Sequence, residues 1–495
     1  MLERELKFSP GPSFTLPDLA DDDHGLTADA PVTIKLVAAY FDTPDLRLAR
    51  AGASLRHRND EGWLVKLPVA RGEGLTRSEL HVAGDDDEPP AVALDLVRAL
   101  ARTAPVQLIA RLNTVRTKVV VRDADGHQVA EVADDEVSVI DGVRLAARFR
   151  ELEIELAEDV DDDIAALIAR RVQGAGAGQP DPVPKIVRAI GPRALDAPDL
   201  ASARALDLAS TPREVLAAAV ANSVGRLIAH DPGVRLGEDS EAVHQARVAT
   251  RRLRSDLRTF RSVIDEQWSE SLRAELKWLG ERLGEVRDAD VLLERLVAQL
   301  DELPHADTAG ARTLLDTLRR ERDAALDALV LTLRSDRYVA LLDRLVDATH
   351  ALPPAADRDD VDDIELEALV RPLWKKLRRS VDALDHDPPD AALHEVRIRA
   401  KRTRYAAEAV APAIGRDARQ FAKRIADVQE VLGEHQDAVV AEQWLRAQLG
   451  STSSGPMLFV AGELAAIERA AARAARAQFP AVWKRARRAR LRDWL

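Results

Sequence analysis

The chain has 495 residues, 46% hydrophobic and 31% charged, and its 71 Lys and Arg against 84 Asp and Glu give a net charge of −13. This length predicts more than one domain, and the composition is that of globular proteins. The absence of cysteine excludes disulfides, a thiolate nucleophile and a cysteine-ligated zinc site. The charged N-terminus argues against a secretory signal, and no apolar run approaches the roughly 18–20 residues of a membrane span. We therefore expect a cytoplasmic protein without a membrane partner.

The two parts of the chain differ in charge and in pattern. Residues 1–199 contain 24 Lys and Arg against 36 Asp and Glu, whereas residues 200–495 contain 47 against 48. The first part has short alternating runs separated by Gly, Asp and Pro, which is typical of antiparallel hairpins. The second part is rich in Ala, Leu and Arg at helical spacing. We expect a multidomain α+β chain with a boundary between about 195 and 211, because Thr211, Pro212 and Glu214 form a helix-start motif.

The predicted strands of the first part carry charged side chains on single faces. These positions are Glu3, Glu5, Lys7, Arg56, Arg58, Lys66, Arg77, Arg111, Arg116, Lys118, Glu151, Glu153 and Glu155. For one strand alone, a solvated face is the simpler explanation. A closed antiparallel sheet can instead turn such faces inward. Gathered carboxylates would then need a hard cation such as Mg²⁺ or Mn²⁺, and gathered Lys and Arg would need an anion such as phosphate. This combination suits metal-assisted hydrolysis of a phosphoanhydride.

The ordered set resembles the CYTH, or triphosphate tunnel metalloenzyme, superfamily. The Glu3-x-Glu5-x-Lys7 opening is followed in order by matching segments at 40–43, 55–58, 64–67, 77–79, 151–156 and 185–188. The resemblance implies an eight-stranded antiparallel β tunnel with flanking helices over about residues 1–197, which takes a triphosphate lengthwise.

The resemblance also implies a role for each matching residue. The expected metal ligands are Glu3, Glu5, Glu153 and Glu155; the catalytic cations are Lys7, Arg56, Arg58 and Lys66; the substrate-binding cations are Arg77, Arg111, Arg116, Lys185 and Arg188. Glu151 is an alternative metal ligand, because the register of its strand is open. One of Asp134, Asp135 and Glu136 is a further candidate for the metal, whereas we expect His57 and His81 to be structural.

An internal duplication fills the second part of the chain. His244, Arg247, Arg251 and Arg254 align with His394, Arg397, Lys401 and Arg404 at an offset of 150, and Leu283-Gly284-Glu285 aligns with Leu432-Gly433-Glu434 at an offset of 149. The first four residues follow a spacing of i, i+3, i+7 and i+10, so they share one helix face. Two copies predict a helical bundle with an internal two-fold repeat. Because like charges in a row are destabilising without an anion, the stripe favours a polyanion site over a solvated basic face.

The duplicated pattern resembles the CHAD domain, a helical domain that binds inorganic polyphosphate, over about residues 210–495 with halves at about 210–350 and 365–495. The implied polyphosphate-binding residues are His244, Arg247, Arg251, Arg252, Arg254, His394, Arg397, Lys401, Arg402 and Arg404, with Lys375, Lys376, Arg378 and Arg379 as an extension. We interpret the basic run at 473–492 as a covering helix rather than a groove extension or a nucleic-acid contact. Nucleic acid is not the expected partner, because no recognition module is present.

The expected function is metal-dependent hydrolysis of inorganic triphosphate, joined to polyphosphate binding and to association with polyphosphate granules. Thiamine triphosphate, a nucleoside triphosphate and cyclisation of ATP are alternative reactions for the same kind of tunnel. An alternative of another class is a non-catalytic polyphosphate-binding or targeting protein whose β domain only senses phosphate.

Overall fold

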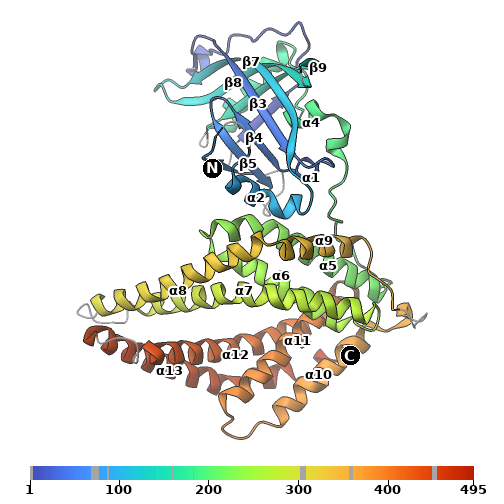
Figure 1. The fold of residues 1–495 in the computed structure, drawn as a ribbon, viewed down its shortest axis with the longest axis vertical. Helices are drawn as coiled ribbons and strands as arrows, with labels where there is room; N and C mark the ends of the chain where they lie inside the picture. Colours follow the sequence, from blue (N-terminus) through green and yellow to red (C-terminus); the bar gives the residue numbers. More distant parts are fainter. Residues whose placement is uncertain are drawn as a thin grey trace. The chain divides into compact units, whose positions relative to one another are not determined.

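The computed structural model describes residues 4–68, 77–85, 88–141, 143–157, 160–181, 183–300, 308–355, 361–448 and 454–495. The chain divides into two compact units, Met1–Asp199 and Leu200–Leu495 (Figure 1). The first unit contains the strands and the second consists of helices, so the predicted α+β class is confirmed. Within the described ranges, none of the helices combines the length and the low charge needed to cross a bilayer.

One antiparallel sheet forms the first unit. Its strands are β1 (Arg4–Phe8), β3 (Val32–Asp42), β4 (Ser54–Arg58), β5 (Gly62–Pro68), β6 (Arg77–Val82), β7 (Gln107–Arg122), β8 (Gln128–Asp141) and β9 (Arg144–Leu156). They pair in the order β1-β9-β8-β7-β3-β4-β5-β6, and the sheet curls around its own interior (Figure 1). A short strand that we did not predict, β2 (Thr27–Ala28), pairs with β7. The expected eight-stranded antiparallel architecture is therefore confirmed, with β2 added at its side.

The register of the sheet separates an apolar face from a charged face. On the outer face, Phe8 and Ile154 pack with Ile168 of α3 (Asp162–Gly174). Around β5, Trp63 packs with Leu96 of α2 (Ala91–Ala101). Because side chains alternate along a strand, burying these apolar residues turns their charged neighbours to the inner face.

A short helix closes on the charged face. In α4 (Lys185–Ile190), Ile186 and Val187 pack in one cluster with Tyr40 and Leu112. Leu112 and Arg116 differ by four positions in β7, so they lie on the same face of that strand. The packing of α4 therefore brings its first residue, Lys185, to the charged interior.

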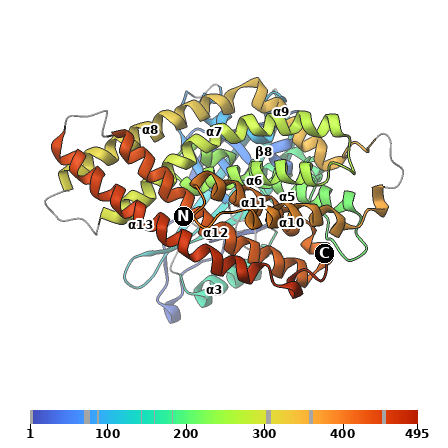
Figure 2. The same cartoon turned by 90° about the horizontal axis from the view of Figure 1, so that it is seen from below.

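The second unit is built from two sets of four helices. The first set is α5 (Pro212–Leu236), α6 (Ser240–Thr259), α7 (Glu266–Gln299) and α8 (Thr308–Arg334); the second is α10 (Leu366–Asp382), α11 (Asp390–Ile414), α12 (Arg416–Gln448) and α13 (Gly455–Ala486). In the chain, α9 (Asp336–His350) connects the two sets, and it packs on α5. The helices that carry the two basic stripes, α6 and α11, contact each other near the middle of this unit (Figure 2). The predicted two-fold repeat is therefore confirmed.

Two features define the ends of this bundle. At the start of α5, the Thr211 side chain and Glu214 form a capping box, with Pro212 in the first turn. Near the end of the chain, Trp483 of α13 contacts Trp374 of α10 with ring centroids 5.4 Å apart, and the ring centroid of Trp494 lies 5.7 Å from that of Phe421. The C-terminal segment thus packs over the bundle, as expected for a covering helix.

Candidate functional site

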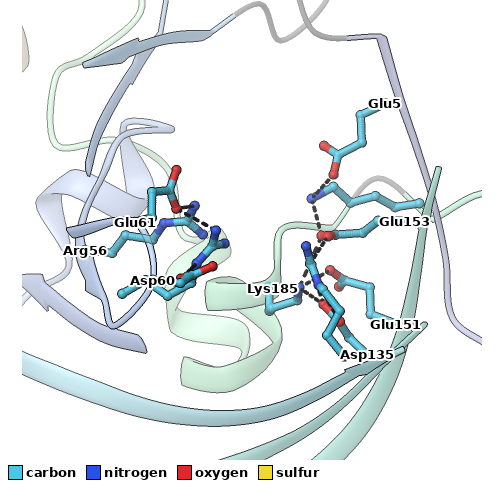
Figure 3. Close-up of polar contacts among 11 residues, drawn as sticks. Glu5, Arg56, Asp60, Glu61, Asp135, Glu151, Glu153 and Lys185 are labelled. Carbon is cyan, nitrogen blue, oxygen red and sulfur yellow. Dashed lines mark hydrogen bonds and ion pairs between the residues drawn. The ribbon is translucent and has the colours of Figure 1, made fainter. Parts of the chain in front are cut away.

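Three cations from three different elements converge on one carboxylate in the first unit. Lys7 of β1 lies directly opposite Glu153 of β9, and its Nζ is 3.2 Å from Glu153 Oε1. Arg116 Nη2 is 2.7 Å from Glu153 Oε2, and Lys185 Nζ is 3.3 Å from Glu153 Oε1 (Figure 3). Burial opposes ionisation of Glu153, but the charges of Lys185 and Lys7 outweigh it and hold its pKa well below the usual range.

A second, more deeply buried carboxylate layer lies beneath this cluster. Asp135 of β8 accepts hydrogen bonds from Arg116 Nε and Nη2, both at 2.8 Å, and from Lys185 Nζ at 2.5 Å. Beside it, Glu151 is completely buried, and among the described residues its two carboxylate oxygens make only long ion-pair contacts, at 3.4 Å to Lys185 Nζ and at 3.4 Å to Arg188 Nε. Burial raises the pKa of Glu151 to about 8, against the opposing charge of Lys185. The adjacent carboxyls of Glu151 and Glu153 therefore have pKa values that are shifted in opposite directions.

The residues at the edge of this cluster fit a divalent cation. One carboxylate oxygen each from Glu5, Glu153 and Glu155 lie within 4.8 Å of one another. Hard cations such as Mg²⁺ and Mn²⁺ bind sets of oxygen ligands, and carboxylates supply both the oxygens and the neutralising charge. The register groups Glu153 and Glu155 with Glu5 and leaves Glu151 deeper in the sheet. Glu3, the remaining expected ligand, lies outside the described residues.

The opposite wall of the curled sheet is basic, and its cations are paired with carboxylates. Arg56 and Arg58 of β4 each place Nη2 2.9 Å from Glu61 Oε2, and Arg58 Nε is 2.6 Å from Asp60 Oδ1. Lys66 of β5 forms an ion pair with Glu79 of β6. Figure 3 shows the group around Arg56 and Glu61 facing the group around Glu153 and Lys185. Cations thus line both walls of the interior, and each is held by an acidic neighbour.

Glu61 and Asp60 were not predicted as part of the site. Both belong to the turn between β4 and β5, where a hairpin brings Asp60 and Glu61 back over Arg56 and Arg58. Two acidic residues directly after an Arg-x-Arg strand are the signal that could have identified them.

Two of the predicted substrate-binding arginines, Arg111 and Arg188, lie outside the centre of this cluster. Arg111 is exposed, and it differs by five positions from Arg116 in β7, so the two side chains lie on opposite faces of the strand. The side chain of Arg77 is not among those described. Arg188 is at the margin, with Nε 3.4 Å from Glu151 Oε2 and Nη2 2.8 Å from Asp181. Arg111 and Arg188 are therefore less central than Arg116 and Lys185.

The remaining candidates of the first unit have structural partners. Asp134 pairs with Arg150, with 2.5 Å between Oδ2 and Nη2. Of these two neighbouring aspartates, Asp135 belongs to the inner cluster and Asp134 does not. His57 is buried, with its ring centroid 5.1 Å from that of Trp63, and His81 is exposed near Glu61.

The two basic stripes of the second unit meet where α6 contacts α11. Burial, together with the charges of Arg397, Arg251 and Arg247, lowers the pKa of Lys401 to about 7. The pKa of Arg251 is also lowered, by burial and by the charges of Arg247 and Arg397. Mutual lowering of this kind requires the four cations to lie close together. The structure therefore brings Arg247, Arg251, Arg397 and Lys401 into one group.

The two repeat-equivalent histidines, His244 and His394, lie on the same helix faces as this group, but their neighbours differ. His394 Nδ1 is 2.6 Å from Gln436 Oε1, whereas the repeat equivalent of Gln436 near His244 is Arg287. Burial, followed by the charge of Arg287, lowers the pKa of His244.

The outer members of the stripes differ in their partners. Arg252 and Arg404 both pair with Glu408 at 2.6 Å, whereas Arg254 and Arg402 have no ion-pair partner within 4 Å in the part of the chain that the structure describes. The proposed extension on α10, which consists of Lys375, Lys376, Arg378 and Arg379, is exposed to solvent.

Comparison with known proteins divides the chain into the same two parts. The CYTH domain model matches residues 1–175 and the CHAD domain model matches residues 218–446. An uncharacterized protein of Mycobacterium tuberculosis is 31% identical over 486 residues, which are 94% of this chain and 92% of the relative. The human thiamine-triphosphatase is 39% identical over 72 residues, which are 14% of this chain and 29% of that protein. The solved CHAD domain of the plant Ricinus communis is 28% identical, with a TM-score of 0.42, over 56% of this chain and 95% of that structure.

Proposed function

Because the chain belongs to the family in which a CYTH domain is followed by a CHAD domain, we propose that its first unit hydrolyses inorganic triphosphate with a divalent metal ion and that its second unit binds inorganic polyphosphate. The CYTH domain places the first unit among the triphosphate-tunnel enzymes. Our proposal concerns three further points: inorganic triphosphate as the substrate, the residues that act on it, and polyphosphate as the ligand of the second unit.

The observation that carries the hydrolase proposal is the pair of cationic walls beside three clustered carboxylates. Glu5, Glu153 and Glu155 would hold the metal ion, which would supply Lewis-acid neutralisation of charge on the phosphate oxygens. Lys7 and Lys185 are placed to contact phosphate at the same wall, because both already contact the carboxylate of Glu153. Preorganised cations of this kind stabilise the charge that develops during phosphoryl transfer.

The opposite wall would bind the far end of the triphosphate. Arg56 and Arg58 present guanidinium groups to the interior, and Lys66 adds an ammonium group on the next strand. Their pairing with Glu61 and Glu79 keeps these side chains oriented before the substrate enters. A linear triphosphate suits this arrangement, since it carries charge along its length and needs cations at both ends.

The cluster of Arg247, Arg251, Arg397 and Lys401 supports polyphosphate binding by the second unit. Holding these four cations together is unfavourable, and Asp288 and Asp437 beside Arg247 and Arg397 offset the repulsion only in part, so a polyanion would stabilise the group. The depressed pKa of Lys401 reflects that cost, in addition to the cost of burial. Polyphosphate fits because the site has charges from two helices, and the aromatic ring beside it, that of Tyr405, is buried and covered by Arg252 rather than open to a base.

Thiamine triphosphate is a second candidate substrate, because human thiamine-triphosphatase is similar to part of this chain. Phosphate release from inorganic triphosphate, thiamine triphosphate, ATP and long-chain polyphosphate, each with Mg²⁺, Mn²⁺ or a chelator, decides between them. We expect metal-dependent release that is fastest with inorganic triphosphate and is lost in Glu5→Gln. No release from any substrate would leave a phosphate-sensing, polyphosphate-binding protein.

The same variants separate the two units. Glu5→Gln is expected to retain polyphosphate binding, whereas Arg251→Ala combined with Arg402→Ala is expected to lose it and to retain triphosphate hydrolysis. Loss of polyphosphate binding in Glu5→Gln would contradict this division of roles.

A further inference from the structure

Two arginines at equivalent positions of the two repeats have neighbours of opposite charge. Arg252 of α6 and Arg402 of α11 are repeat equivalents at an offset of 150. Arg252 Nη2 is 2.6 Å from Glu408 Oε2 on the facing helix. At the same offset the equivalent of Glu408 is Arg258, and Arg402 lies near Arg258, whose charge adds to burial in lowering the pKa of Arg402. One contact between the stripes is thus an ion pair and its counterpart is a repulsion.

The side with the repulsion contains further arginines, of which only Arg273 has an ion-pair partner among the described residues. Burial lowers the pKa of Arg254, and the charges of Arg273 and Arg258 add to this effect, while the charge of Glu281 opposes it. Nε is buried without a hydrogen-bond partner in Arg254 and Arg273, as it also is in Arg252, so the two sides differ in their ion pairs rather than in this atom. Among the described residues, no carboxylate lies within 4 Å of Arg254, Arg258 or Arg402, while Arg273 pairs with Glu270. These four arginines, Arg254, Arg258, Arg273 and Arg402, are the open arginine cluster.

On the other side, Arg252 and Arg404 share the carboxylate of Glu408, and the charge of Arg252 also acts on a second acid, the buried Asp256. Glu408 accepts from Arg252 through Oε2 and from Arg404 through Oε1, both at 2.6 Å. A cavity of about 420 Å³ adjoins this pair between α11 and α12, and it is lined by Arg404, Arg419 and Lys423 together with Glu408. Glu408 is the only acidic side chain of that lining.

The arginine paired with Glu408 is held in place by packing as well as by charge. The Arg252 guanidinium lies 5.3 Å from the ring centroid of Tyr405, and the equivalent of Tyr405 beside Arg402 is Ser255. A cation over an aromatic ring is further stabilised, so Arg252 is fixed in its pairing with Glu408.

We propose that Glu408 acts as an internal anion that takes the place of a phosphate group in one repeat, so that the two halves of the basic site hold polyphosphate unequally. The open arginine cluster contacts the polymer, whereas Arg252 and Arg404 remain engaged with Glu408. A tethered carboxylate has a high effective concentration, and a phosphate of the polymer must displace it before it can use these two arginines. This inference refines the proposed polyphosphate binding and rests on it.

The repeat supplies matched variants for the test. Full-length wild type, Arg402→Gln, Arg252→Gln, Glu408→Gln and the double variant Arg252→Gln/Glu408→Gln are titrated with long-chain polyphosphate over a range of salt concentrations. We expect Arg402→Gln to weaken binding about tenfold and Arg252→Gln less than about threefold, because only Arg402 is free to contact phosphate. Glu408→Gln is expected to tighten binding about three- to tenfold and to steepen the salt dependence by about 0.7 for each added phosphate contact.

The double variant gives the sharpest comparison. Once Glu408 is neutral, Arg252→Gln should cost about as much affinity as Arg402→Gln costs in the wild type. Equal losses for Arg252→Gln and Arg402→Gln in the wild-type background, or a Glu408→Gln variant with wild-type affinity and salt dependence, would overturn the inference. If a glutamine variant does not fold, as judged by circular dichroism and thermal melting, Arg252→Lys and Arg402→Lys make the same comparison.

The outcomes also separate this inference from the function on which it rests. Absence of polyphosphate binding by the wild type would overturn both. Binding by the wild type with equivalent effects in the two repeats would overturn only the unequal use of the halves.

Discussion

Arg247 and Arg397 are repeat equivalents that make the same pair of contacts with the next helix. Arg247 Nη1 lies 2.8 Å from Asp288 Oδ1, and Arg397 Nη2 lies 3.9 Å from Asp437 Oδ1. Each arginine also passes over a glycine four residues before that aspartate, Gly284 or Gly433. The duplicated Gly-x-x-x-Asp spacing in α7 and α12 is therefore explained as a seat for the arginine of the preceding helix. The aspartate orients the guanidinium, which passes over the glycine at van der Waals distance from where a Cβ would lie.

A stability prediction follows from the space at these glycines. A Cβ at Gly433 would lie 3.8 Å from Arg397 Nε, which is an ordinary contact. Gly433→Ala is therefore expected to stabilise the protein by up to about 1 kcal/mol, because alanine has the higher helix propensity. In Gly310→Ala, the matched contrast, the Cβ would collide with the backbone carbonyl of Pro456, and a loss of roughly 1–3 kcal/mol is expected. Urea unfolding of both variants measures the difference, and a larger loss in Gly433→Ala would refute this account.

The charged face of the sheet was predictable because strand alternation is a local property. The positions of Glu5 and Lys7, and of Glu153 and Glu155, follow from counting by two along a strand. The same counting places Arg111 and Arg116 on opposite faces of the strand, because they differ by five positions. Arg111 was assigned to the substrate on the family resemblance, although strand alternation argues against placing it beside Arg116.

Contacts between distant segments were not predictable in the same way. Lys185 reaches Asp135, 50 residues earlier in the chain, because Ile186 and Val187 pack against the sheet, and no local pattern specifies that packing. The same holds for the unequal repeats. The aligned stripes predicted two similar basic faces, but only the crossing of α6 and α11 brings Glu408 to Arg252.

The two arginines of β7 test the assignment of faces. Arg116 makes a bidentate contact with Asp135 and a further contact with Glu153, and only a guanidinium can make all three. Arg116→Lys is expected to lower kcat/KM for triphosphate about 10- to 100-fold. Arg111→Lys and Arg111→Gln are expected to change it less than about twofold, because Arg111 is exposed on the other face. Steady-state kinetics of the purified variants decides this, and a strong effect at Arg111 would place it in the substrate path.

The carboxylates of the inner face predict a selective loss of metal binding. Glu155→Gln removes one of the three clustered carboxylates, so it is expected to weaken Mn²⁺ binding and to lower triphosphate turnover at least about tenfold. Glu136→Gln is the control, because Glu136 is exposed in β8 and alternates with the inward Asp135. Mn²⁺ titration followed by electron paramagnetic resonance reports binding without turnover. Equal Mn²⁺ affinity in Glu155→Gln and Glu136→Gln would remove Glu155 from the proposed metal site.

Lys401 predicts that polyphosphate binding weakens as pH rises. Burial, together with Arg397, Arg251 and Arg247, lowers the Lys401 pKa to about 7, with Asp437 opposing the shift. A bound polyanion favours the charged amine, so binding is coupled to proton uptake above pH 7. Affinity should therefore fall between pH 7 and pH 9, by up to about tenfold per pH unit. Long-chain polyphosphate remains ionised throughout this range.

Two variants at position 401 isolate this effect. Lys401→Arg keeps a charge at every pH of the test, so its affinity should stay nearly constant from pH 7 to pH 9. Lys401→Met removes the titrating amine and should bind more weakly, again with little dependence on pH. In the wild type the unfolded chain binds more protons than the folded chain between pH 7 and the ordinary lysine pKa of about 10.4, so charging Lys401 opposes folding at neutral pH. Lys401→Met should therefore raise the melting temperature at pH 7 by a few degrees, on the order of 1–3 °C. A wild type whose affinity follows that of Lys401→Arg across the range would show that Lys401 stays charged throughout.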